Sequence, residues 1–172
     1  MADVSKNFWG GHAIVGAHIP IAAGLALADK MEKRDGVTVC MFGEGATNIG
    51  YFHEGVNLAK AWELPVLWVC ENNRYGMGTP PSKASAVSEI IQKACGYGMS
   101  AYDVDGMDVM AVRKMVSERL EDIRLPFPGD ADARVDHGDR QLRPCRCLRQ
   151  SRLHVDLPLL GELHGVADQV EQ

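Results

Sequence analysis

The sequence lacks the features typical of membrane-spanning, secreted and nucleic-acid-binding proteins. None of its apolar runs approaches the length needed to cross a bilayer, and its start shows no basic stretch followed by an apolar one. The formal net charge is −5, so no excess of basic residues predicts a nucleic-acid surface. Cys145 and Cys147 are too closely spaced for the usual zinc ligand pairs. We therefore expect one α/β domain that has neither a membrane nor a nucleic acid as partner.

Six residue types are missing from the C-terminal part of the chain. Between Pro128 and Gln172 there is no Phe, Tyr, Met, Ile, Asn or Lys, while arginine, aspartate, leucine and proline abound. The missing residues are those encoded by A/T-rich codons. We therefore divide the chain into a domain at 1–125 and a divergent tail at 126–172, interpreted as a frameshifted translation of GC-rich coding sequence. An ordinary variable or disordered tail is the alternative, which an unbroken reading frame in the source gene would favour.

Two polar stretches each follow an apolar, β-rich run. Val37–Phe42 precedes the sequence GEGATN at 43–48, and Pro65–Cys70 precedes ENNRYG at 71–76. Between them, residues 49–62 have helical spacing and contain no proline. This pattern predicts a strand, a turn, a helix and a second strand. A crossover of this length suits two parallel strands of one sheet, and such units are almost always right-handed.

The predicted topology brings the two polar stretches to the same edge of the sheet, where open α/β folds bind ligands. Glu44 supplies a carboxylate, Asn73 supplies an amide oxygen, and the turn after Asn73 offers backbone carbonyls. Hard oxygen ligands of this kind suit Mg²⁺, which usually keeps further ligands from a phosphate. Gly43 and Gly45 allow the backbone to approach a ligand closely, and the following helix directs unpaired N–H groups to the same place. The pattern predicts a metal–diphosphate site.

The remaining segments predict a three-layer α/β sandwich with a mainly parallel sheet. We expect helices at 19–34 and 51–62, a loop at 76–87, a short helix at 88–94, a third strand within 97–104, and a helix at 108–124. Asp105-Gly106-Met107-Asp108 is interpreted as a turn and helix N-cap rather than as a second metal site.

The sequence around the two motifs resembles a known family. Gly-Glu-Gly at 43–45, followed after a crossover by Asn-Asn at 72–73, is similar to the thiamine-diphosphate motif, which is Gly-Asp-Gly to Asn-Asn in most of that family. FWGGHAIVG at 8–16 and ENNRYGMGT at 71–79 resemble the alpha subunits of pyruvate dehydrogenase components of 2-oxo acid dehydrogenase complexes. The resemblance runs from about Lys6 to Arg124 and implies a partial thiamine-diphosphate-binding fold.

The resemblance implies a specific set of magnesium ligands. They are the Glu44 side chain, the Asn73 side chain and the main-chain carbonyl of Tyr75. Glu44 replaces the aspartate of most members, and its extra methylene moves the carboxylate by about 1.5 Å, so an adjusted backbone preserves ligation. Some branched-chain relatives also carry glutamate there.

The resemblance also implies contacts to the organic part of the cofactor. The main-chain N–H groups of Gly45 and Ala46, next to Gly43, would bind the diphosphate. Ala13 and Val15 would hold the aminopyrimidine ring through their main chains. The Gly-His-Ser sequence expected further along is absent, and no residue of this chain is assigned a catalytic role.

The activity implied by the resemblance is that of an oxidoreductase linked to glycolysis. Such enzymes use thiamine diphosphate and magnesium to decarboxylate a 2-oxo acid and transfer the acyl group to a lipoyl carrier. The implied partners are a beta subunit, in a heterotetramer of two alpha and two beta chains, and a lipoyl-bearing acyltransferase. A beta-subunit glutamate starts the proton relay in this family, so the chain alone is expected to be inactive. The implied location is the bacterial cytoplasm or the mitochondrial matrix.

Several functional interpretations remain open at this point. Gly76-Met77-Gly78 favours pyruvate or acetoin over branched-chain substrates. A truncated fragment that neither binds the cofactor nor assembles is the non-enzymatic alternative. A nucleotide-binding module is weaker, because Gly43-x-Gly45 lacks both the Gly-x-Gly-x-x-Gly spacing and a following Gly-Lys-Ser/Thr.

Overall fold

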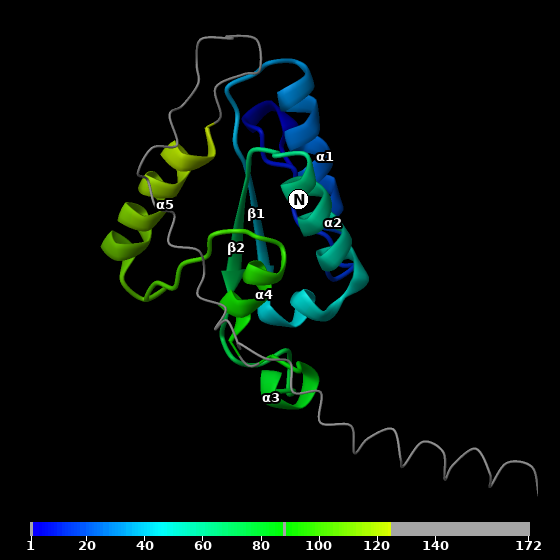
Figure 1. Ribbon diagram of the computed structural model, residues 1–172, viewed down its shortest axis with the longest axis vertical. Coiled ribbons are helices and arrows are strands. Elements are labelled where there is room, and N and C mark those ends of the chain that lie inside the picture. Colours follow the sequence, from blue (N-terminus) through cyan, green and yellow to red (C-terminus); the bar gives the residue numbers. More distant parts are fainter. Residues whose placement is uncertain (1, 88, 125–172) are drawn as a thin grey trace, which may run out of the picture.

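The computed structural model describes residues 2–87 and 89–124 (Figure 1). The predicted tail at 126–172, with its two closely spaced cysteines, lies outside the described residues. The elements are, in chain order, η1 (Val4–Lys6), α1 (His18–Met31), β1 (Thr38–Gly43), η2 (Glu44–Asn48), α2 (Gly50–Ala61), β2 (Val66–Glu71), α3 (Pro81–Ala84), α4 (Ile90–Gly96) and α5 (Val109–Ile123).

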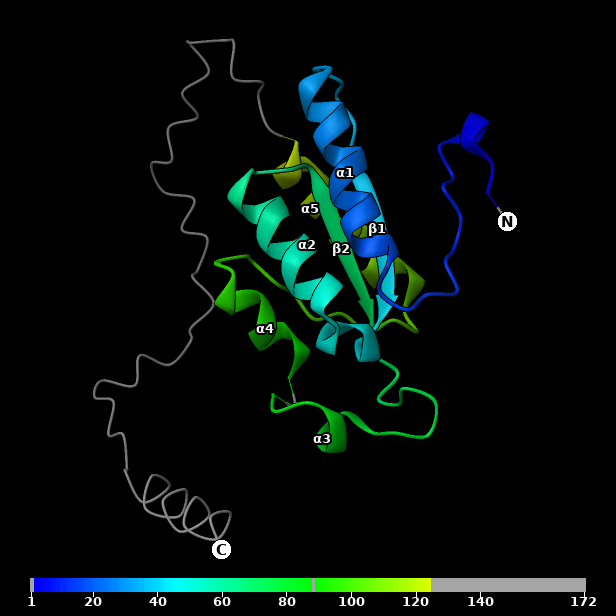
Figure 2. The ribbon, with the colours of Figure 1, turned by 90° about the vertical axis from the view of Figure 1, so that its right-hand side faces the viewer.

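The predicted strand–turn–helix–strand unit is confirmed. β1 and β2 pair in parallel, from Thr38 opposite Val66 to Gly43 opposite Glu71, and α2 forms the crossover between them. The two strands therefore end level with each other. Their carboxyl ends lead into η2 on one side and into the loop before α3 on the other (Figures 1 and 2).

The helices form layers on both sides of this small sheet. α1 and α2 contact each other and cover one face, while α5 packs against β2 from the opposite side (Figures 1 and 2). The chain thus has an α/β fold with a parallel sheet between helices. α1 ends at Met31, earlier than the predicted Arg34, because Lys33 adopts a left-handed backbone with φ of 55°.

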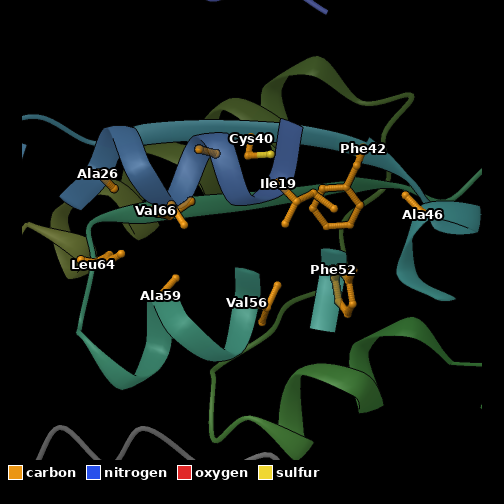
Figure 3. Packing of buried hydrophobic residues seen from close by; sticks show 12 residues of the cluster. Ile19, Ala26, Cys40, Phe42, Ala46, Phe52, Val56, Ala59, Leu64 and Val66 are labelled. Carbon is orange, nitrogen blue, oxygen red and sulfur yellow. The ribbon is translucent and has the colours of Figure 1, made fainter. Parts of the chain in front are cut away.

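The hydrophobic core lies between α1, α2 and the inner face of the sheet (Figure 3). Phe42 contacts the ring of Phe52 edge-on, with ring centroids 5.6 Å apart. Gly55 of α2 lies so close to α1 that an added Cβ would be 2.9 Å from Cγ2 of Ile19. The small residues of α1 are mostly buried here: Ala22, Ala23 and Ala26. Their small size allows the two helices to pack closely.

The other face of the sheet is only partly covered. Val39 and Met41 of β1 point away from the core and are 52% and 56% exposed. Their partners in the ladder, Leu67 and Val69 of β2, are half-buried, since α5 packs against β2. The β1 half of this face therefore remains open among the described residues.

The predicted third strand is wrong. Residues 97–104 contain no strand: the chain folds back on the end of α4 at 97–99, and 100–104 pair with neither strand of the described sheet. The amides of Gly98 and Met99 donate to the carbonyls of Cys95 and Ala94, at 3.0 and 3.1 Å, and Gly98 has a φ of 65°. The loop predicted at 76–87 likewise contains one short helix, α3, whose first residue is Pro81.

Candidate metal–diphosphate site

The two motif loops lie side by side at the carboxyl edge of the sheet. Gly43 and Glu71 are ladder partners, so Glu44 and Asn73 follow two strand ends at the same level. The loops also approach each other further on, because a Cβ added to Gly45 would lie 3.8 Å from Cα of Gly76. The prediction that the topology brings these stretches together is therefore confirmed.

Glu44 is the buried acidic residue at this edge. It begins η2, the 3₁₀ turn that follows β1 directly, and only 4% of its surface is exposed. Its Oε1 atom has no hydrogen-bond partner among the described residues. A buried carboxylate oxygen without a donor is costly unless a cation or another donor approaches it. The position of Glu44 therefore fits the binding of a metal ion.

The loop after β2 is shaped by its two asparagines. Asn72 Oδ1 accepts from the amide of Arg74 at 3.3 Å, and Asn73 Oδ1 accepts from the amide of Tyr75 at 3.1 Å. Arg74 adopts a left-handed backbone, with φ of 68°, at the centre of this turn. An amide oxygen accepts two bonds, so Asn73 Oδ1 keeps one lone pair for another partner. Tyr75 is 58% exposed.

Gly43, Gly45 and Ala46 form the turn beside Glu44. Ala46 is buried, whereas both glycines are exposed. An added Cβ would meet nothing within 4 Å at Gly43 and would make only an ordinary contact at Gly45. No protein neighbour among the described residues therefore demands glycine here. The absence of these side chains leaves open space on the exposed side of the turn.

Ala13 and Val15 lie in the irregular segment before α1. Both are exposed. The end of this segment is held near β1 and η2: His18 Nε2 is 2.9 Å from the carbonyl of Met41, and Gly16 lies against Ile49. In the described part of the chain, no backbone hydrogen bond links Ala13 or Val15 to the Glu44 or Asn73 loops. Their predicted role at the aminopyrimidine ring therefore remains a prediction.

Two residues to which the motif assigns no role, Thr47 and Lys93, organise the turn after β1. Thr47 is 0% exposed and its hydroxyl donates to the Glu44 carbonyl at 2.7 Å. Lys93 of α4 donates to the Thr47 hydroxyl and to Asn48 Oδ1, both at 2.7 Å. Burial lowers the pKa of the Lys93 ammonium from its ordinary value. Thr47 lies inside the motif, but nothing near Lys93 in the sequence indicates its contact.

Other histidines and acidic turns have structural partners. His53 is exposed, and its Nδ1 atom lies 2.5 Å from the Tyr97 hydroxyl. Asp105 forms the predicted turn, since its Oδ1 atom accepts from the amide of Met107 at 2.9 Å. Asp108 forms the predicted helix cap, since its side chain accepts from the amides of Met110 and Ala111. No cluster of three or more His, Cys, Asp or Glu side chains suited to a metal occurs in the described part of the chain. The described helices also include none long and apolar enough to cross a membrane.

Comparison with known proteins identifies several relatives of this chain. The alpha subunit of the pyruvate dehydrogenase E1 component from Rhizobium meliloti is 44% identical over 124 residues, which is 72% of this chain and 36% of that protein. The alpha subunit of acetoin:2,6-dichlorophenolindophenol oxidoreductase from Bacillus subtilis is 45% identical over 124 residues, 72% of this chain and 37% of that protein.

A mitochondrial type II pyruvate dehydrogenase E1 alpha subunit from Ascaris suum is 49% identical over 111 residues, 64% of this chain and 28% of that protein. The chain therefore spans about a third of the length of the curated relatives that it matches. The sequence pattern of the dehydrogenase E1 component family matches residues 1–124. With its two motif loops at one sheet edge and this match over most of its length, the chain belongs to the dehydrogenase E1 component family.

Proposed function

We propose that this chain is part of an E1 alpha subunit that binds magnesium and thiamine diphosphate for the decarboxylation of a 2-oxo acid. The observation that carries the proposal is the buried Glu44 carboxylate. Its Oε1 atom has no partner among the described residues, and it lies at a strand end level with the Asn73 loop. A divalent cation would satisfy this oxygen and would bring a diphosphate to the adjacent turn.

The residues that would hold the metal are those at the two strand ends. Glu44 and Asn73 would supply side-chain oxygens, and Tyr75 would supply its main-chain carbonyl. The Asn73–Tyr75 hydrogen bond orders this loop before a metal binds, which reduces the entropic cost of ligation.

The diphosphate and the ring would be held mainly through backbone groups. The N–H groups of Gly45 and Ala46 would donate to the diphosphate, in the space that Gly43 and Gly45 leave free. Ala13 and Val15 would hold the aminopyrimidine ring through their main chains. When bound, thiamine diphosphate supplies the nucleophilic carbon and the electron sink for decarboxylation. The role of the chain is to bind and orient the cofactor, and no residue of it is proposed to be catalytic.

The proposed partners follow from the family. We propose assembly with a beta subunit into a heterotetramer, and transfer of the acyl group to a lipoyl-bearing acyltransferase. Because the proton relay requires a beta-subunit glutamate, the chain alone should show no turnover. The relatives include bacterial proteins and mitochondrial ones, so the proposed location is the bacterial cytoplasm or the mitochondrial matrix.

Pyruvate is the preferred substrate, with acetoin as the second candidate. Gly76-Met77-Gly78 favours these over branched-chain 2-oxo acids, and the relatives are named for pyruvate and for acetoin. The test combines the chain with beta subunit, magnesium and thiamine diphosphate and measures dye reduction with each substrate. Turnover of branched-chain substrates without turnover of pyruvate or acetoin would contradict this assignment.

Cofactor binding is tested by calorimetric titration with magnesium thiamine diphosphate. Glu44→Gln should weaken binding by at least about 100-fold. Substituting a residue that only hydrogen-bonds to a metal ligand already lowers metal affinity by up to about 100-fold, and Glu44 is proposed to be a ligand itself. The matched control is Glu54→Gln, which changes an exposed glutamate of α2 and should bind normally. Equal dissociation constants for Glu44→Gln and the unmodified chain would exclude Glu44 as a ligand. If the unmodified chain binds nothing, the alternative of a truncated fragment without cofactor binding is favoured.

A further inference from the structure

We propose that Lys93 is a positioning residue for this site, which fixes the main chain of Glu44 through the hydroxyl of Thr47. This inference deepens the proposed function and rests on it for the identity of the ligand. The contacts themselves belong to the described structure. They connect α4, which contributes none of the proposed ligands, to the turn that carries Glu44.

The Lys93 ammonium uses its three hydrogens on this turn. It donates to Thr47 Oγ1 at 2.7 Å, to the Thr47 carbonyl at 3.3 Å and to Asn48 Oδ1 at 2.7 Å. An ammonium has three donors and no acceptor, so these contacts saturate it. Lys93 therefore has no donor left for a ligand of its own, and its effect must pass through Thr47 and Asn48.

The Thr47 hydroxyl links Lys93 to the main chain of Glu44 through two hydrogen bonds. Its hydroxyl accepts from Lys93 and donates its own hydrogen to the Glu44 carbonyl at 2.7 Å. Thr47 is 0% exposed, so water does not compete for these bonds. Bonds to a charged donor are stronger than neutral ones, and a chain of bonds is strengthened by mutual polarisation.

The turn needs such support because its own hydrogen bonds are weak. η2 is a five-residue 3₁₀ helix, a conformation with poor hydrogen-bond geometry, and Gly43 offers no side-chain cap. The Glu44 Oε1 atom has no partner of its own, so no bond to that atom orients the side chain. Its position therefore depends on the backbone that Thr47 and Lys93 hold.

Asn48 extends the connection to the loop after β2. Its Nδ2 donates to the carbonyl of Ala84 in α3 at 3.0 Å, while its Oδ1 accepts from Lys93. The segment that follows Asn73 is thus linked to the same turn as Glu44. Lys93 would therefore hold both strand-end loops in one arrangement before a cation binds.

The test compares the unmodified full chain with three variants in which a lysine is substituted. Lys93→Met removes the donors, Lys93→Arg keeps the charge, and Lys60→Met changes an exposed lysine of α2 as the control. We expect Lys93→Met to weaken magnesium thiamine diphosphate binding by about tenfold, the lower end for groups that orient metal ligands. Lys93→Arg should retain most of the affinity of the unmodified chain, and Lys60→Met should bind normally. Unchanged affinity in Lys93→Met, or an equal loss in Lys60→Met, would overturn the inference.

A second measurement separates this inference from the proposed function. Hydrogen exchange of the amides at 44–48, without any cofactor, should be faster in Lys93→Met than in the unmodified chain. If the unmodified chain binds no magnesium thiamine diphosphate, the proposed function fails, and exchange still decides whether Lys93 fixes the turn. Unchanged exchange at 44–48 would overturn the inference whatever the cofactor result.

Thr47 provides a variant pair in case Lys93→Met does not fold. Thr47→Ser keeps the hydroxyl that links Lys93 to Glu44, whereas Thr47→Val removes it with little change in volume. Slow exchange at 44–48 should be retained in Thr47→Ser and lost in Thr47→Val. Equal exchange rates in these two variants would contradict the proposed connection.

Discussion

Glu44 and Cys40 are both buried and ionisable, but burial has opposite consequences for them. Glu44 lies at the open end of a strand, where its unpartnered oxygen can meet a cation. Cys40 faces the core in the middle of β1, and burial raises its thiol pKa from 9.0 to about 11. The same cost of burying a charge thus favours ligand binding at one residue and keeps the other residue neutral.

The raised pKa of Cys40 predicts a loss of stability in alkali. The folded state disfavours the thiolate, so this contribution is complete below about pH 9 and is lost as pH rises towards 11. Urea unfolding at a series of pH values should show a steeper alkaline decline for the unmodified chain than for Cys40→Ala. Equal slopes for the two proteins would mean that other groups account for the decline.

At the scale of elements, the sequence predicted those parts that depend on local pattern. The crossover unit, its two strands and the cap at Asp108 have local signatures, and all were found. The strand expected at 97–104 has an apolar pattern as well, but a pattern does not reveal whether a neighbouring strand exists. The contact of Lys93 with Thr47 joins residues far apart in the chain, and no local motif marks it.

The N-cap of α5 should make a measurable contribution to stability. Asp108 Oδ1 accepts from the amides of Met110 and Ala111 at 2.9 and 3.1 Å. Asp108→Ala should lower the free energy of unfolding by about 0.5–2 kcal/mol, as measured by urea denaturation. Asp103→Ala, at an exposed position outside a helix, is the control and should change stability little. A loss of the same size in the control would indicate a general charge effect.

Because α1 packs closely on α2, substituting glycine by alanine should lower the free energy of unfolding at one position and raise it at another. In Gly55→Ala the new Cβ would lie 2.9 Å from Cγ2 of Ile19 and 3.3 Å from the backbone nitrogen of Pro20, so the helices must separate. We expect a loss of about 1–3 kcal/mol in the free energy of unfolding. In Gly24→Ala the new Cβ meets nothing within 4 Å, and higher helix propensity should add about 0.5–1 kcal/mol. Stabilisation by both substitutions in thermal melts would contradict the close packing.

At the scale of the whole molecule, the described chain leaves part of its sheet uncovered. α5 packs against β2, while Val39 and Met41 of β1 remain open. The chain spans about a third of the length of its relatives. An apolar strand face in contact with water favours self-association.

Polar replacement of this face should reduce self-association. The double variant Val39→Thr and Met41→Thr introduces threonine, which suits strands, at both positions and removes apolar surface from each. Sedimentation velocity should show a smaller associated fraction than for the unmodified chain. Val109→Thr with Met110→Thr, at residues 75% and 66% exposed on α5, serves as the control. An equal reduction in the control would show that exposed apolar area in general, rather than the β1 face, drives association.

The level ending of β1 and β2 limits which insertions and deletions the motif can tolerate. Gly43 and Glu71 share a rung, and one extra residue in either strand would shift its loop by about 3.3 Å and invert every side chain beyond it. The connection from Trp62 to Pro65 lies at the other end of the strands and so does not set the level of the two motif loops. Grafting this motif onto another scaffold therefore requires both strand lengths to be conserved together.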